Sequence, residues 1–148
     1  MKLFRILAVA AVLPFAALAE EPPAFTVGPY EAAEIGDLDQ FLWLRRPVVV
    51  FADTPNDPNF RRQMQAIEAD VAGLEERDVV VIIDTDPEAH SAVRQRLRPR
   101  GFSLVLMDKD GEVKRRAPAA WSIRELVHAI DRFPLRREEM LERNPAGR

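Results

Sequence analysis

The sequence of 148 residues contains no cysteine. Thiol redox chemistry, iron–sulfur clusters and thiolate zinc sites all need this residue, so the sequence excludes them. Disulfides are excluded as well, and the fold must be stable through packing alone. Histidine is scarce: His90 and His128 belong to no spaced metal motif, and no G-x-S-x-G nucleophile turn is present. We therefore assign no catalytic residue, and we expect no metal motif and no bound cofactor.

The chain also has no excess of positive charge. It carries 21 Lys and Arg against 24 Asp and Glu, a formal net charge of −3. Nucleic-acid-binding domains show a basic patch and a high isoelectric point, so we expect no nucleic-acid partner.

Residues 1–19 have the three parts of a secretory signal peptide. Lys2 and Arg5 form the basic part, residues 6–18 are an apolar run, and Ala17-Leu18-Ala19 fits the cleavage site. A membrane-spanning helix needs about 20 apolar residues, and this run is shorter. We therefore predict cleavage after Ala19, a periplasmic or secreted protein, and no membrane span once the signal is removed.

The mature chain divides into three parts. Residues 20–36 are rich in Pro, Ala and Glu, which is typical of a flexible leader. Residues 37–143 show regular hydrophobic patterns and predict one domain, and residues 144–148 predict a disordered tail.

Within the domain, buried strands alternate with amphipathic helices. Continuous apolar runs predict strands at 47–52, 79–83 and 102–107, and an edge strand at 112–116 follows the Asp110-Gly111 turn. Helical stripes and cap residues predict helices at 58–74, 87–98 and 123–133, with shorter ones at 37–44 and 135–143. A helix that crosses over between two strands makes them parallel, and the hairpin adds antiparallel strands. The order predicts an α/β, thioredoxin-like three-layer α/β/α sandwich with a mixed sheet of about four strands.

Two segments resemble thioredoxins and peroxiredoxins. "RPVVVFA" (46–52) stands where their central strand enters the catalytic turn, and "SLVLMDKDGEV" (103–113) resembles their closing hairpin. The turn here is Asp53-Thr54-Pro55-Asn56, without cysteine, and Phe102 or Ser103 stands where that family has a cis-proline. The activity is therefore not carried over: the chain is not a thiol oxidoreductase, and we favour a protein that is not an enzyme.

A second resemblance spans about residues 38–141. Five blocks carry it in order: "FLWLRRPVVVFA", "DPNFRRQ", "ERDVVVI", "MDKDGEVK" and "IDRFPLRREEM". They resemble an exported bacterial family with a domain of unknown function, which recurs in vertebrate extracellular-matrix proteins with sushi repeats. This resemblance implies the fold and export but supplies no reaction.

The best candidate site lies where neighbouring strands end. Carboxyl ends of parallel strands share one sheet edge, where ligands bind in open α/β folds. This edge should gather Asp53, Thr54, Asp84 and Arg100 as ligand-binding residues, and the carboxylates could attract a hard cation. The alternative is structural: Asp57 and Asp86 cap helices, Asp53 shapes a turn, and the arginines pair with them.

Other polar and aromatic residues are interpreted structurally. Trp43 is expected to pack in the core, Trp121 to staple a helix start, and Asp108 to form a turn at the opposite end of the sheet. The arginines within 94–100 and the charges at 136–139 are expected on the surface, with a docking role for the latter as an alternative.

Two functions remain open. The first is a non-enzymatic binding or interaction module outside the cytoplasm, with another exported protein or an envelope component as its partner. The alternative is a thiol-independent enzyme, or a protein that binds a small ligand or cation at the edge around Asp53.

Overall fold

The computed structural model describes residues 24–145. The predicted signal peptide, its cleavage site and residues 20–23 of the predicted leader lie outside the described residues, as do residues 146–148 of the tail. No helix in the described part is both long enough and apolar enough to cross a membrane.

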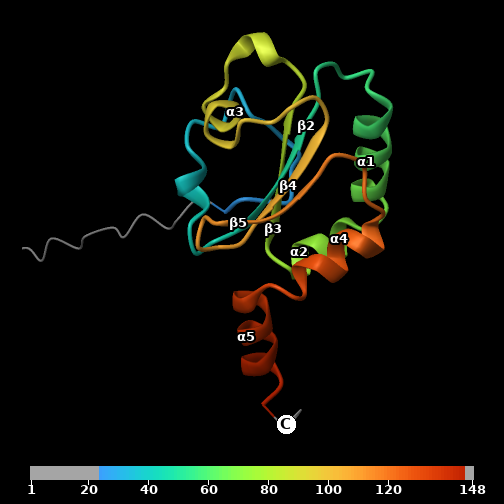
Figure 1. Cartoon of the computed structure of the whole chain (residues 1–148). Helices are drawn as coiled ribbons and strands as arrows, with labels where there is room; N and C mark the ends of the chain where they lie inside the picture. Colours follow the sequence, from blue (N-terminus) through green and yellow to red (C-terminus); the bar gives the residue numbers. More distant parts are fainter. Residues whose placement is uncertain (1–23, 146–148) are drawn as a thin grey trace, which may run out of the picture.

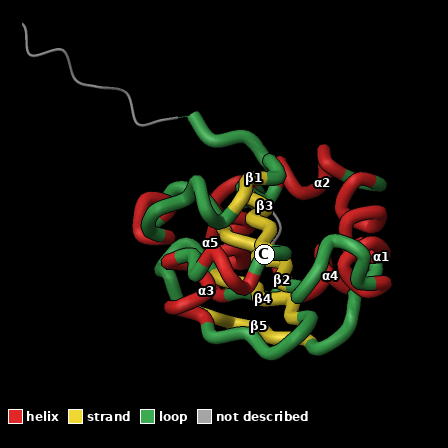
Figure 2. The backbone as a smooth tube through the Cα atoms, turned by 90° about the horizontal axis from the view of Figure 1, so that it is seen from above, coloured by secondary structure: helices red, strands yellow, loops and turns green. Residues whose placement is uncertain are grey.

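A five-stranded mixed sheet forms the centre of the domain, in the order β1-β3-β2-β4-β5 (Figures 1 and 2). Its strands are β1 (Tyr30–Glu31), β2 (Arg46–Phe51), β3 (Val79–Asp84), β4 (Ser103–Met107) and β5 (Val113–Ala117). Strands β1, β3 and β2 are parallel, whereas β4 runs antiparallel to both β2 and β5. The topology confirms the predicted thioredoxin-like α/β fold.

Helices cover both faces of the sheet. The helices are α1 (Pro58–Glu68), α2 (Val71–Glu76), α3 (Ala92–Leu97), α4 (Ile123–Ile130) and α5 (Pro134–Arg143), with 3-10 turns at Leu38–Phe41 and Pro87–Ala89. One core lies under α1, α2 and α4, and contains Val48, Val50, Leu104 and Leu126. Alternate residues of the same strands, such as Val49 and Val105, face the second core beside α3. The continuous apolar runs of the sequence follow from this burial on two faces.

Two predicted helices are interrupted. The stripe at 58–74 divides into α1 and α2, because the side chain of Asp70 accepts a hydrogen bond from the Gly73 backbone N–H and caps a second helix. Val71 is consequently exposed. The segment after Asp86 forms only a 3-10 turn that ends at His90 in a left-handed conformation, and Ser91 then caps α3.

The start of the domain differs from the prediction of a flexible leader. Residues 24–36 pack on the sheet: β1 pairs with β3, and Val27, Ala32 and Ile35 are buried. The segment lacks an obvious strand pattern because β1 is only two residues long. It supplies the fifth strand, where the sequence predicted about four.

The prediction that Trp43 packs in the core is wrong. The 3-10 turn places Phe41 in the core, and Trp43 follows with a φ of 63° and is 66% exposed. Trp121 packs against the core beside α4, and the staple itself stays a prediction. Ser122 and Glu125 form the predicted capping box.

Candidate functional site

The turn that follows β2 is open to solvent. Asp53 and Thr54 are exposed, and Thr54 Oγ1 accepts a hydrogen bond from the Asn56 backbone N–H at 3.3 Å. Asp57 Oδ1 accepts hydrogen bonds from the backbone N–H groups of Asn59 at 2.7 Å and Phe60 at 3.2 Å. The predicted cap is therefore present, and the turn shapes the entry into α1.

Replacement of Asp57 by alanine should destabilise the protein by about 0.5–2 kcal/mol, because two N–H groups at the helix start lose their acceptor. Asp53→Ala should change stability by less than about 0.5 kcal/mol, since its side chain is exposed. Thermal melts of both variants, with and without Ca²⁺, provide the measurement. A more stable Asp53→Ala variant, together with a Ca²⁺-dependent rise in the wild-type melt, would instead identify a cation site.

Asp84, at the end of β3, is the buried member of the predicted group. Its Oδ2 accepts from Ser91 Oγ at 2.6 Å, and its Oδ1 accepts from Arg94 Nη2 at 2.8 Å and from the Asp86 backbone N–H at 3.2 Å. Burial raises the pKa of Asp84, but the hydrogen bonds from Arg94 and Ser91 outweigh burial and lower it overall. The carboxylate is thus charged and engaged at both oxygens.

Arg94, rather than Arg100, is the partner of Asp84. Arg94 also donates to the carbonyl oxygens of Ala52 and Asp84, both at 3.1 Å, and its guanidinium lies 5.3 Å from the centre of the Phe51 ring. The expectation of a solvated surface is therefore wrong for Arg94. Arg100 is exposed, and no ion pair joins it to Asp84 within the described part of the chain.

The Asp84–Arg94 pair is indicated in the sequence by the spacing between Ser91 and Arg94. Asp84 ends a buried strand and Ser91 starts a helix, so the first turn of that helix must bring residue 94 close to the strand end. The predicted position of the helix start, at Asp86, concealed this relationship.

A shallow pocket of about 230 Å³ adjoins Asp84. Its lining includes Glu31, Glu34 and Asp86, so it is acidic, while Asp53 and Thr54 are not part of it. Among residues 24–145, no group of three or more His, Asp or Glu side chains is arranged to hold a metal ion.

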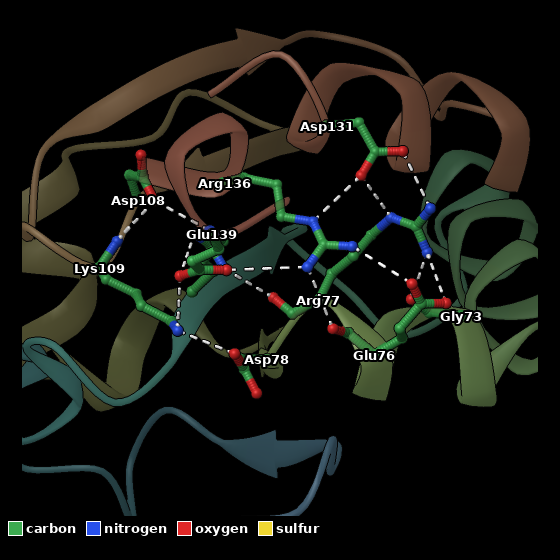
Figure 3. Close-up of polar contacts among 10 residues, drawn as sticks. Gly73, Glu76, Arg77, Asp78, Asp108, Lys109, Asp131, Arg136 and Glu139 are labelled. Carbon is green, nitrogen blue, oxygen red and sulfur yellow. Dashed lines mark hydrogen bonds and ion pairs between the residues drawn. The ribbon is translucent and has the colours of Figure 1, made fainter. Parts of the chain in front are cut away.

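The opposite end of the sheet contains a buried ion-pair network (Figure 3). Arg46, the first residue of β2, is fully buried and donates from Nε to Asp108 Oδ1 at 2.9 Å. Its two terminal nitrogens donate to the carboxylate of Glu139 at 2.9 and 3.2 Å, and one also donates to the Arg77 carbonyl at 3.0 Å. Lys109 Nζ pairs with Glu139 and with Asp78, both at 2.8 Å.

The network corrects two predictions. Asp108 does belong to the hairpin turn, because it accepts from the Lys109 backbone N–H, but it is also a buried partner of Arg46. Its Oδ2 is buried and has no hydrogen-bond partner among the described residues. Within α5, Arg136 is buried and Glu139 is 22% exposed, so these two are not ordinary surface charges.

A second group of charges extends the network to α2 and α4. Arg77 forms a two-pronged pair with Asp131, at 2.8 and 2.9 Å, and Arg136 donates to Asp131 and Glu76, both at 3.3 Å. Burial raises the pKa of Asp131, but the bonds from Arg77 and Arg136 outweigh it and lower the pKa. These contacts hold α5 below α2 and α4, at the end of the sheet where β2 starts (Figure 1). These ion pairs stabilise the docked position of α5, and the side chains that form them have little freedom to bind a ligand.

The surface between β5 and α4 has a different character. A pocket of about 390 Å³ is lined by Arg115 and Arg116 from β5, and by Trp121, His128 and Arg132 from the α4 segment. We call it the β5–α4 pocket. Glu125 also lines it, but its carboxylate already accepts from Ser122.

None of the three arginines of the β5–α4 pocket forms an ion pair with a carboxylate of residues 24–145, unlike Arg46, Arg77, Arg94 and Arg136. Sequence reasoning missed this surface because charges on an edge strand look like ordinary solvated residues. The adjacent Arg115-Arg116 on the predicted edge was the available signal.

Comparisons with known proteins agree with the fold. The chain is 30% identical to the sushi repeat-containing protein SRPX of Rattus norvegicus over 121 residues, which cover 70% of this chain and 26% of that protein. It is 27% identical to coiled-coil domain-containing protein 80 of Danio rerio over 140 residues, covering 74% of this chain and 16% of that one. The chain thus spans about a quarter, or less, of the length of these curated relatives.

Among solved structures, a reduced 2-Cys peroxiredoxin of Plasmodium vivax superposes with a TM-score of 0.53 at 13% identity. The match covers 70% of this chain and 84% of that one. At this identity the likeness concerns the fold alone. The sequence model described as domain of unknown function DUF4174 matches residues 37–139, and the chain therefore belongs to this family, as a member with a thioredoxin-like fold and no cysteine.

Proposed function

We propose that the protein is an exported, thiol-independent binding module that recognises another exported protein or an envelope component. The β5–α4 pocket carries the proposal: three arginines without ion pairs in the described chain line the same pocket as Trp121. Arginine and tryptophan are enriched among residues that dominate binding energy at interfaces. Other exposed arginines of the described chain, such as Arg61 and Arg62, also form no ion pair, so the distinguishing feature is that three arginines share one pocket with a tryptophan.

The turn after β2, which stands where redox proteins have their catalytic turn, supports a role other than redox catalysis. In disulfide exchange the attacking group is a thiolate, and the corresponding turn here contains Asp53-Thr54-Pro55-Asn56. The neighbouring carboxylate of Asp84 is held by Arg94 and Ser91. The signal-peptide pattern of residues 1–19 supports action outside the cytoplasm, in the periplasm or medium.

The alternative function, a thiol-independent enzyme or a small-ligand or cation site around Asp53, draws less support. Asp84 is saturated by its own neighbours, and Arg100 lies elsewhere. The Ca²⁺ melts of the Asp53 variant address this alternative directly.

Cross-linking in the native host tests the proposal. A photoreactive amino acid placed at His128, an exposed lining residue of the β5–α4 pocket, should form an adduct of higher mass with a component outside the cytoplasm. The same group at Thr54, on the exposed turn after β2, serves as the matched control and should give no adduct. Adducts from Thr54 alone, or from neither position, would refute the proposal.

A further inference from the structure

Strand β5 forms an open edge of the sheet (Figure 2). It pairs with β4 through Leu104 opposite Ala117, Val105 opposite Arg116 and Leu106 opposite Arg115. No further strand of residues 24–145 pairs with its outer side. An edge strand presents backbone N–H and C=O groups that can pair with another extended chain.

Two pockets lie along this edge and share one residue. The β5–α4 pocket is one, and a second pocket of about 280 Å³ is lined by Arg98, Arg100, Phe102 and Arg116, among others. Arg116 therefore lines both. Successive side chains of a strand leave it towards opposite faces, yet both Arg115 and Arg116 line the β5–α4 pocket.

The charge along this edge is mainly positive, with Glu125 as the one carboxylate among the described residues that line the β5–α4 pocket. Lys114 pairs with Asp110 and Glu112, but Arg115 and Arg116 have no carboxylate partner within the described residues. The whole chain is acidic, with a net charge of −3, so this surface is a local exception. Charged residues on an edge strand can simply prevent self-pairing. Preventing self-pairing requires no pockets, whereas here Arg115 lines one pocket and Arg116 lines two.

We propose that the β5 edge binds an extended, acidic polypeptide segment of the partner as an added strand. Backbone hydrogen bonds would hold the segment along β5, and alternate side chains would enter the two pockets, as in other cases of strand addition. Arg115 and Arg116 bind its carboxylates, because a guanidinium matches a carboxylate through two parallel hydrogen bonds. A polypeptide fits better than another polyanion, since only a polypeptide uses both the backbone edge and the charges. This inference rests on the proposed binding function and names its partner class.

A synthetic peptide of alternating Glu and Thr, long enough to cover β5, tests the inference with the purified protein. Fluorescence anisotropy should show saturable binding that weakens with added salt. The double variant Arg115→Gln/Arg116→Gln should weaken binding by about tenfold or more, because two charge-assisted contacts are lost. Arg61→Gln/Arg62→Gln, in an exposed arginine pair of α1, is the matched control and should bind like the wild type.

Two further ligands separate strand addition from charge alone. A peptide of the same sequence with N-methyl groups at alternate residues should bind much more weakly, because it cannot complete the backbone pairing. Dextran sulfate should bind no more tightly than the unmodified peptide. Equal binding of the methylated peptide, tighter binding of dextran sulfate, or equal losses in both double variants would overturn the inference. An adduct from His128 with no binding of the acidic peptide would overturn this partner class while leaving the proposed function intact.

Discussion

Replacement of Arg46 by methionine should lower the free energy of unfolding by about 3–5 kcal/mol, the range measured when one partner of a buried ion pair is removed. Methionine retains much of the volume of arginine, so the loss reports on charge and hydrogen bonds. The variant leaves Asp108 with a buried charge and removes the two-pronged partner of Glu139. Urea unfolding followed by circular dichroism measures the difference.

Arg96→Met is the matched control for this experiment. Arg96 also pairs with two carboxylates, those of Asp37 and Asp39, but its side chain is 38% exposed and its partners are more exposed still. Pairs in such positions contribute about 0–1 kcal/mol, because water screens the charges. Equal losses in the Arg46 and Arg96 variants would contradict the view that burial makes the Arg46 network important.

The sequence predicted the strands well because their signal is local. Each central strand is a continuous apolar run, and a strand buried on two faces leaves that pattern in the sequence. The caps at Asp57 and Ser122 are local too, since each cap side chain accepts from backbone N–H groups within one helical turn of it. The short β1 has no such pattern, and its position depends on pairing with β3.

The buried charges could be predicted only in part. Val48 lies opposite Leu106 in the antiparallel pair, and continuing this register by two residues on each strand places Arg46 opposite Asp108. The Arg46–Asp108 contact is thus a cross-strand neighbour that follows once the pairing and register of β2 and β4 are known. Glu139 could not be found in this way, because its contact depends on how α5 docks at the end of the sheet where β2 starts. A helix with charges on all sides gives no indication of its buried face.

The candidate site shows the same limit. Ends of parallel strands can be grouped from the element order, and the sequence did place Asp53 and Asp84 at one edge. The sequence named Arg100 at this edge and missed Arg94 as the partner of Asp84, because that pairing depends on where α3 begins. Pairing of side chains requires atomic positions, and a shift of one helical turn changes the partner.

Low pH should reduce the stability of the protein through the protonation of Glu139. Burial raises the pKa of Glu139, but the hydrogen bonds and charges of Arg46 and Lys109 outweigh it and bring the pKa to about 2, from an ordinary value of 4.5. The folded state thus holds the charged carboxylate more strongly than the unfolded state does. The stabilisation from Glu139 is fully present above about pH 4.5, and is lost as the pH falls towards 2.

Glu139→Gln should therefore be less stable than the wild type at pH 7 by up to about 3 kcal/mol, since each pKa unit corresponds to about 1.4 kcal/mol. The two proteins should become equally stable near pH 2, where the wild-type side chain is also becoming neutral. Urea unfolding of both proteins at several pH values measures the difference.

Glu138→Gln, an exposed change in the same helix, is the control and should differ in stability from the wild type by less than about 0.5 kcal/mol at every pH. The pKa values of Asp84 and Asp131 are also lowered, so both proteins lose further stability in acid, and only the difference between them isolates Glu139. A difference that stays constant from pH 7 to pH 2 would mean that Glu139 stabilises the docking of α5 by packing rather than by its charge.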